Sequence, residues 1–92
     1  MPTVEVRHAH SLSPEDCKQK VEHWTKKIER KYGLSSKWVS ERRLDVSGKG
    51  VKAQVHLEDK LLAVRIELPL LMALVKPALE KMLHDILKKE FV

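Results

Sequence analysis

The chain has 92 residues, of which 42% are hydrophobic, so it can build one small core, and we expect a single domain over residues 1–92. Its one cysteine, Cys17, excludes an intrachain disulfide, and without a secretory signal or a spanning run of roughly 20 apolar residues the chain is predicted to be cytoplasmic. The net charge of +5 is concentrated between Lys18 and Lys52, where 11 basic residues face four acidic ones; this favours an anionic partner or a solvated basic face.

The first third of the chain predicts a strand followed by a helix. Val4, Val6, His8 and His10 alternate with Glu5, Arg7 and Ala9, which is typical of a strand with one face inward. Ser13 and Pro14 form a helix-start signal, and Gly33 can adopt the left-handed conformation that ends a helix. We therefore predict a helix over residues 14–32. Its inward stripe is Cys17, Val21, Trp24, Ile28 and Tyr32.

The middle of the chain predicts three antiparallel strands joined by short turns. Residues 37–47 form the first, with Trp38, Leu44 and Val46 on its inward face. Ser40 and Arg42 interrupt that pattern and indicate a bulge or a wet edge. Residues 51–57 and 62–68 alternate cleanly and form the next two strands, and Pro69 ends the last of them.

The chain closes with an apolar run, Leu70 to Val75, and an amphipathic helix that begins near Pro77. The inward residues of this helix are predicted to be Leu79, Met82, Leu83, Ile86 and Phe91. The complete order is strand, helix, three strands, helix. It predicts a two-layer α+β fold, in which the antiparallel meander and the first strand form a four-stranded sheet with both helices on one face.

Short motifs along the whole chain resemble one known family. They are Val4-x-Val6-Arg7, His10-Ser11-Leu12, Tyr32-Gly33-Leu34, the strand from Gly50-Val51 to Val55, and Leu68-Pro69-Leu70-Leu71. In these motifs the chain resembles the polyhydroxyalkanoic acid system proteins, whose genes are found beside those for polyhydroxyalkanoate synthesis and granule formation in bacteria. The resemblance implies this context, without an established activity or catalytic residues. It favours a non-enzymatic accessory or granule-associated protein.

The apolar run is wider than one buried stripe requires. It has three interpretations: core buried by the last strand and the first helix, the seam of a homodimer, or a docking surface for a hydrophobic granule, flanked by lysines. The candidate contact residues for a granule, a granule protein or a second copy are Leu71, Met72, Leu74 and Val75.

A basic face is the second candidate surface, and it supports an alternative function, RNA or ribosome binding. Its residues are Lys26, Lys27, Arg30, Lys31, Arg42 and Arg43. Ribosome hibernation factors and double-stranded RNA-binding folds have a similar order of elements, although fold order alone is weak evidence for function. Trp24 and Trp38 are predicted to face inward, so stacking on single-stranded bases is not favoured.

His8, His10 and Cys17 are the only grouping that suggests metal binding or thiol chemistry. His8 and His10 share one face of a strand, and Cys17 lies in the first turn of the helix. No further ligands accompany them, and Cys17 begins an apolar stripe, so we predict that His10 instead positions the strand-to-helix turn. We expect no catalytic residues, metal or cofactor. A ligand cup between the sheet and the last helix is a further alternative.

Overall fold

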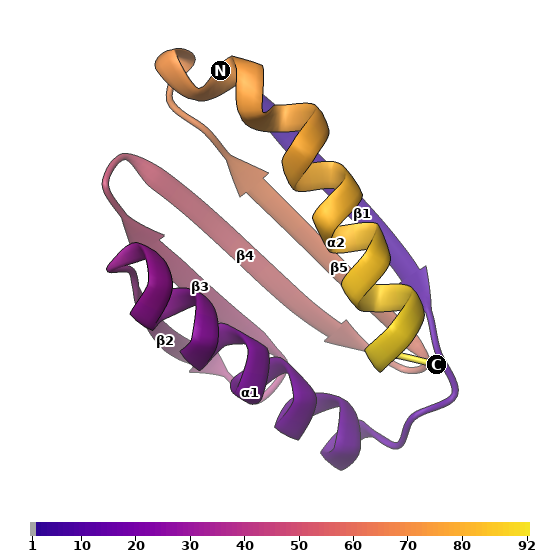
Figure 1. The fold of residues 1–92 in the computed structure, drawn as a ribbon. Helices are drawn as coiled ribbons and strands as arrows, with labels where there is room; N and C mark the ends of the chain where they lie inside the picture. The colour runs from indigo at the N-terminus through magenta and orange to yellow at the C-terminus, as the bar shows by residue number, and fades with distance from the viewer. Residues whose placement is uncertain (1) are drawn as a thin grey trace.

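The computed structural model describes residues 2–92, which form a five-stranded antiparallel sheet with two helices on one of its faces (Figure 1). The elements are β1 (Thr3–Ala9), α1 (Pro14–Tyr32), β2 (Ser35–Ser40), β3 (Arg43–Gly48), β4 (Val51–Glu58), β5 (Leu61–Glu67), the 3-10 helix η1 (Leu70–Val75) and α2 (Lys76–Glu90). The strand order is β1-β5-β4-β3-β2, so β1 and β2 form opposite edges. The predicted α+β class and placement of the helices are confirmed.

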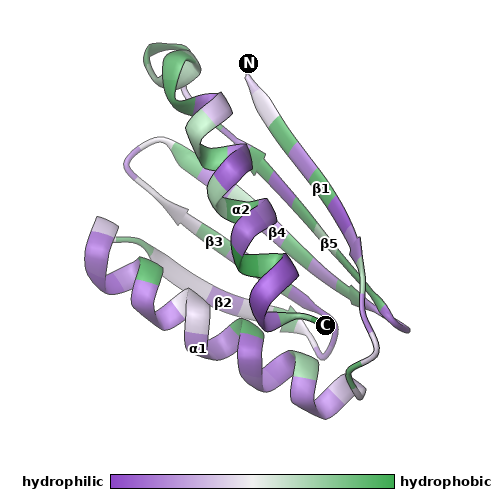
Figure 2. Ribbon diagram, turned by 45° about the vertical axis from the view of Figure 1, so that its right-hand side comes forward, coloured by the Kyte–Doolittle hydropathy of each residue, from purple (hydrophilic) through white to green (hydrophobic). Residues whose placement is uncertain are grey.

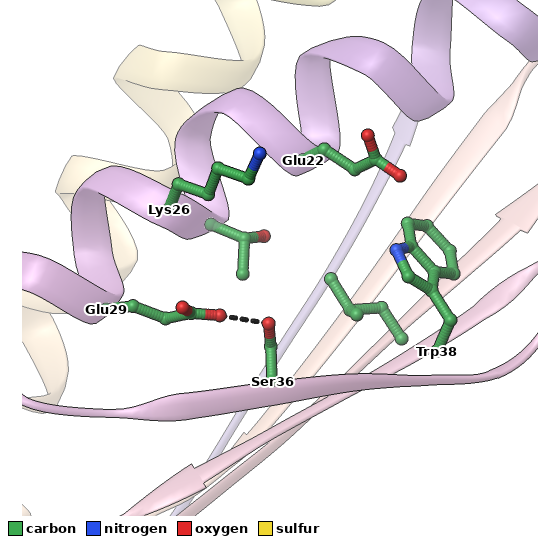
Figure 3. A pocket seen from close by; sticks show the side chains of 7 residues that line it. Glu22, Lys26, Glu29, Ser36 and Trp38 are labelled. Carbon is green, nitrogen blue, oxygen red and sulfur yellow. Dashed lines mark hydrogen bonds between the residues drawn. The ribbon is translucent and has the colours of Figure 1, made fainter.

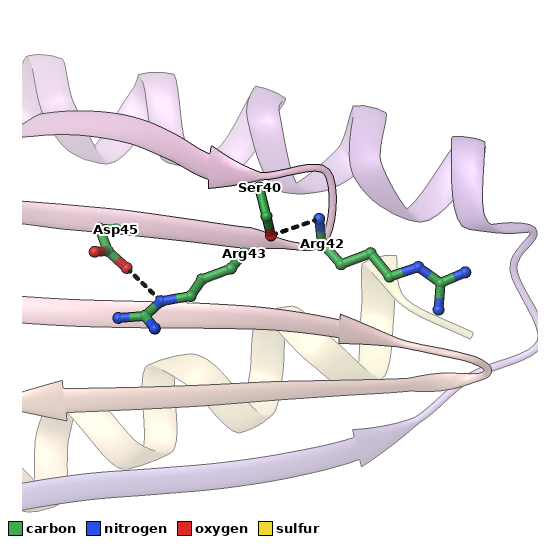
Figure 4. Close-up of polar contacts among 4 residues, drawn as sticks. All are labelled: Ser40, Arg42, Arg43 and Asp45. Carbon is green, nitrogen blue, oxygen red and sulfur yellow. Dashed lines mark hydrogen bonds and ion pairs between the residues drawn. The ribbon is translucent and has the colours of Figure 1, made fainter.

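The sheet has one strand more than the sequence predicts. Residues 37–47 do not form a single strand, because the chain turns back at Glu41 and Arg42 to form the β2–β3 hairpin. The backbone N–H of Arg42 donates to the Ser40 hydroxyl at 3.3 Å within this turn (Figure 4). The register also shifts between Trp38 and Ser40, which is the irregularity that the interrupted pattern indicates.

Helix α1 begins and ends where its capping residues predict. The Ser13 hydroxyl accepts a hydrogen bond from the backbone N–H of Asp16 at 3.2 Å, and Pro14 occupies the first turn. At the other end Gly33 adopts φ 69°, and its N–H donates to the Glu29 carbonyl at 2.8 Å. These interactions satisfy backbone groups that helix ends otherwise leave without partners.

The hydrophobic core lies between the sheet and the two helices. Its fully buried members alternate along the strands, as the period of two requires. They are Val4, Val6, Leu44, Val46, Leu57, Leu62, Ile66 and Leu68 from the sheet and loops, with Cys17, Val21, Leu87 and Phe91 from the helices and the C-terminal segment. The residues predicted to face inward on α2 did not include Leu87, which is the buried residue of that helix.

The two helices cover the sheet unevenly. Helix α2 packs against β1, whereas α1 packs against β2 and β4 (Figure 1). Between them, Ala53, Val55 and Val64 stay only half-buried. An ion pair between Lys20 and Glu90, at 3.5 Å, links the two helices. The middle of the apolar sheet face is therefore a strip that this chain covers only in part.

The other face of the sheet is polar. Its ion pairs are Arg65–Glu5 at 3.5 Å, Arg65–Glu67 at 3.7 Å, Arg7–Glu58 at 3.9 Å and Arg43–Asp45 at 3.0 Å. Exposed pairs of this kind contribute at most about 1 kcal/mol each. This face is therefore well solvated, and the three most exposed large apolar side chains of residues 2–92, Leu70, Leu71 and Leu74, lie elsewhere, in η1.

We expect Phe91→Ala to lower the free energy of unfolding by about 3–5 kcal/mol, as measured by urea denaturation. The Phe91 side chain is 3% exposed. Its carbonyl accepts a hydrogen bond from His8 Nε2 at 2.7 Å, and the neighbouring Val92 carbonyl accepts one from the Ser11 N–H at 3.1 Å. The control is Val92→Ala, because that side chain is 68% exposed. Equal stabilities of the two variants would contradict a core role for Phe91.

Candidate functional site

Helix η1 places an apolar surface outside the core. Pro69, with φ −64° and ψ 155°, ends the extended chain, and the 3-10 turns that follow contain no buried residue. The exposed fractions are 76% for Leu70, 97% for Leu71, 93% for Leu74 and 43% for Val75. We call these four residues the apolar tip. In Figure 2 it is a green segment at one end of the molecule, whereas α1 is mostly purple.

Three of the four predicted contact residues, Leu71, Leu74 and Val75, belong to the apolar tip. Leu71 and Leu74 lie on the same side of η1, because a 3-10 helix has about three residues per turn. Met72 instead packs against the core, and its N–H donates to the Pro69 carbonyl at 2.9 Å. The interpretation of the whole run as core is wrong. Leu70 was missed, since nothing in an unbroken apolar run distinguishes its exposed members.

Exposure of this kind has an energetic consequence. Burying one leucine side chain contributes roughly 1.5–3 kcal/mol, and the apolar tip gives up most of this gain in the free protein. Several exposed apolar residues in one segment are a pattern typical of contact surfaces rather than of a solvated face. The apolar tip is therefore the candidate functional site.

The structure does not bring the six predicted basic residues together. Lys26, Lys27, Arg30 and Lys31 are exposed on α1, as predicted. Arg42 lies in the β2–β3 turn and forms an ion pair with Asp59 at 3.7 Å. Arg43 donates to Asp45 at 3.0 Å on the opposite face of the sheet (Figure 4).

The direction of β2 explains this separation. Near the C-terminal end of α1, the Ser36 hydroxyl donates to the Glu29 carboxylate (Figure 3). Further along β2, the Trp38 ring lies under the Lys18 ammonium, 4.6 Å from it. Strand β2 thus runs back toward the start of the helix, and Arg42 lies beside that start, several turns from Lys31.

Lysines cover three of the aromatic rings. Besides Lys18 over Trp38, the Lys27 ammonium lies 4.8 Å from the Trp24 ring and that of Lys31 lies 5.5 Å from the Tyr32 ring. These are cation–π contacts. A base would have to displace the lysines before it could stack on the rings, so the structure gives no support to recognition by stacking.

A shallow hollow lies between α1 and β2 (Figure 3). It is lined by Glu22, Thr25, Lys26, Glu29, Ser36, Trp38 and Leu44. The hydrogen bond between Ser36 and Glu29 crosses it and ties the edge strand to the helix. The hollow thus has a structural explanation. Trp24, Trp38 and Leu83 pack against the core, so side chains occupy the space expected for a ligand cup.

His10 positions the strand-to-helix turn, as predicted. Its Nδ1 accepts a hydrogen bond from the Leu12 N–H at 3.1 Å, so the neutral ring carries its proton on Nε2, which faces Cys17 Sγ at 3.5 Å. Burial, and to a lesser extent the charge of His8, lowers the pKa of His10, while burial raises the pKa of Cys17. Both groups are therefore neutral near pH 7, which disfavours a reactive thiolate–imidazolium pair.

Within residues 2–92, no three or more His, Cys, Asp or Glu side chains are grouped so that they could hold a metal ion. No helix in the same range has both the length and the apolar character that a membrane span requires.

We expect the stability of the protein to fall as the pH drops below about 6.5, the ordinary histidine value. The folded state lowers the pKa of His10, so between that lowered pKa and the ordinary one the unfolded chain binds the extra proton. The measurement is the free energy of unfolding at pH 5 and pH 7.5. His10→Gln should lose less stability over this interval than the parent protein. An equal loss in both proteins would show that another group causes the pH dependence.

The chain matches a known protein family. The model of the family described as "Putative polyhydroxyalkanoic acid system protein" matches residues 4–91. These residues include nearly all of β1 and every later element, so the match covers the whole fold. No curated protein and no solved structure matches the chain significantly.

Proposed function

The chain belongs to the polyhydroxyalkanoic acid system protein family, and we propose that it is a non-enzymatic accessory protein that associates with polyhydroxyalkanoate granules in the bacterial cytoplasm. In this proposal it acts by binding a surface or a protein, without a cofactor. The observation that carries the proposal is the exposure of Leu71 and Leu74, the two most exposed large apolar side chains of residues 2–92.

The proposed mechanism is transfer of the apolar tip from water to the granule surface. Burying Leu71 and Leu74 would contribute roughly 3–6 kcal/mol in total, before the cost of immobilising the protein is subtracted. Lys76 and Lys81 lie in the first two turns of α2. Lys76 pairs with Glu80 at 3.9 Å, so Lys81 is the one of the two that adds attraction to an anionic surface. The apolar part of this interaction is insensitive to salt, whereas the part due to lysines is screened.

A second copy of the chain is the other proposed partner of the apolar tip. Stable protein interfaces bury at least about 1,200 Å² in total, with well-packed partners on both sides. Four residues of one short helix supply only part of such an area. A homodimer would therefore need to cover additional apolar surface, such as the half-buried strip at Ala53, Val55 and Val64.

RNA or ribosome binding is the alternative function, and it would use the exposed cations of α1. It differs from the first proposal in its dependence on salt. Contacts with phosphates release counterions, so affinity for RNA falls steeply as the salt concentration rises. The separation of Arg42 and Arg43 from α1 leaves the helix with four of the six predicted residues.

We expect the protein to sediment with native polyhydroxyalkanoate granules at both low and high salt, because apolar contacts hold it. The variant Leu71→Glu/Leu74→Glu should lose this retention. Its matched control is Val39→Glu/Val92→Glu, which changes two other exposed apolar residues in the same way. Circular dichroism verifies that both variants fold.

Other results of this experiment would redirect the proposal. Release of the parent protein at high salt, or no binding at all, would favour the cations of α1, and ribosomes and RNA would become the next partners to test. Analytical ultracentrifugation of Leu74→Glu addresses the homodimer. If both oligomer size and granule retention are unchanged in this folded variant, the apolar tip is not the binding surface.

A further inference from the structure

Three segments that are distant in sequence meet at the end of the molecule that carries the apolar tip (Figure 1). A Cβ added to Gly33, just after α1, would lie 3.4 Å from Lys49 Cε in the β3–β4 turn. A Cβ added to Gly50 would lie 3.5 Å from Pro69 Cγ, next to η1. The β3–β4 turn is therefore a neighbour of both the end of α1 and the start of η1, and it lies between them.

This end of the molecule is positively charged. Arg30 and Lys31 occupy the last turn of α1, and Lys49 is held at φ 52° between two glycines at the top of the β3–β4 turn. All three side chains are exposed, and within residues 2–92 none of them forms an ion pair. We call these three residues the basic end.

The carboxylates at this end are already engaged by other groups. Glu29 accepts the hydrogen bond from Ser36. Glu67 pairs with Arg65 at 3.7 Å, and Glu80 pairs with Lys76 at 3.9 Å. The Ser36 hydroxyl is neutral, so Glu29 keeps its negative charge, whereas Glu67 and Glu80 are paired with other cations. The three cations of the basic end therefore retain a net positive charge. Exposed leucines and cations that form no ion pair in residues 2–92 thus occur together at one end of the molecule.

This combination distinguishes between surfaces. An uncharged polymer surface would gain from the leucines alone, whereas an anionic lipid layer gains from both, since apolar side chains enter its acyl boundary and cations bind its headgroups. We propose that the apolar tip inserts into an anionic phospholipid layer while Arg30, Lys31 and Lys49 bind the headgroups. This inference deepens the proposed function, on which it rests, by naming the chemistry of the surface that the tip meets.

The proposal also fixes the orientation of the bound protein. Lys88 and Lys89 lie in the last turn of α2, at the end of the molecule opposite η1 (Figure 1). A protein that docks by its tip holds these two lysines away from the headgroups. At physiological ionic strength the attraction of charges falls off within about 8 Å, so they contribute little. They therefore provide a control with the same change in charge.

The test is sedimentation with vesicles of phosphatidylcholine alone and with vesicles that also contain phosphatidylglycerol. We expect binding to the anionic vesicles and much weaker binding to the neutral ones. Each cation contributes about fivefold in affinity, so Lys31→Gln/Lys49→Gln should weaken binding to anionic vesicles about 30-fold. Lys88→Gln/Lys89→Gln should weaken it less than about 3-fold, and Leu71→Glu/Leu74→Glu should abolish it.

Each other outcome overturns a stated part of the proposal. Equal binding to neutral and anionic vesicles would contradict the proposed contact with the headgroups. Equal effects of the two lysine variants would contradict the proposed orientation, in which the protein docks by its apolar tip. Retention on native granules without vesicle binding would overturn the lipid partner and leave the proposed function intact. Vesicle binding without granule retention would instead overturn the granule function and leave the lipid contact intact.

Discussion

The pairing of β1 with β5 is the constraint on which the rest of the structure depends. Val4 and Val6 lie opposite Ile66 and Val64, which places the first strand at the edge farthest from β2. The connection from β1 to β2, which contains α1, must therefore pass from one edge of the sheet to the other before the hairpins begin. Helix α2 packs against β1, and α1 packs against β2 and β4. Val55, on the apolar face between the two helices, is therefore only half-buried.

The same constraint accounts for the position of the apolar tip. Leu68 is the last residue of the chain to enter the core before α2, and its N–H donates to the Pro2 carbonyl at 2.9 Å beside β1. The chain then has to reverse so that α2 can lie over β1, and this reversal takes place beyond the end of the sheet. Met72 anchors the reversal on its inner side. The outward direction of Leu71 and Leu74 thus follows from the path of the chain.

Local signals were sufficient to predict α1, β4 and β5, because caps and strict alternation depend only on neighbouring residues. The β2–β3 hairpin escaped prediction for a specific reason. In the hairpin, Trp38 lies opposite Leu44, so both side chains point to the same face of the sheet. In one continuous strand they would also share a face, because their positions differ by an even number. The alternating pattern is therefore compatible with one continuous strand and with a hairpin. Glu41-Arg42 contains no Gly, Pro or Asn that would mark a turn. Exposure of Leu70 was equally unpredictable, since it depends on how much space the completed core leaves.

The irregular edge of the sheet bears on what happens when many copies gather on one surface. Crowding in two dimensions raises the frequency at which unpaired strand edges meet, and a flat edge would then join copies into continuous sheets. Strand β2 is interrupted by its register shift, and Lys37 places a charge in its middle. Both features oppose strand addition. At this edge, the bulge therefore disfavours the joining of neighbouring copies into a continuous sheet.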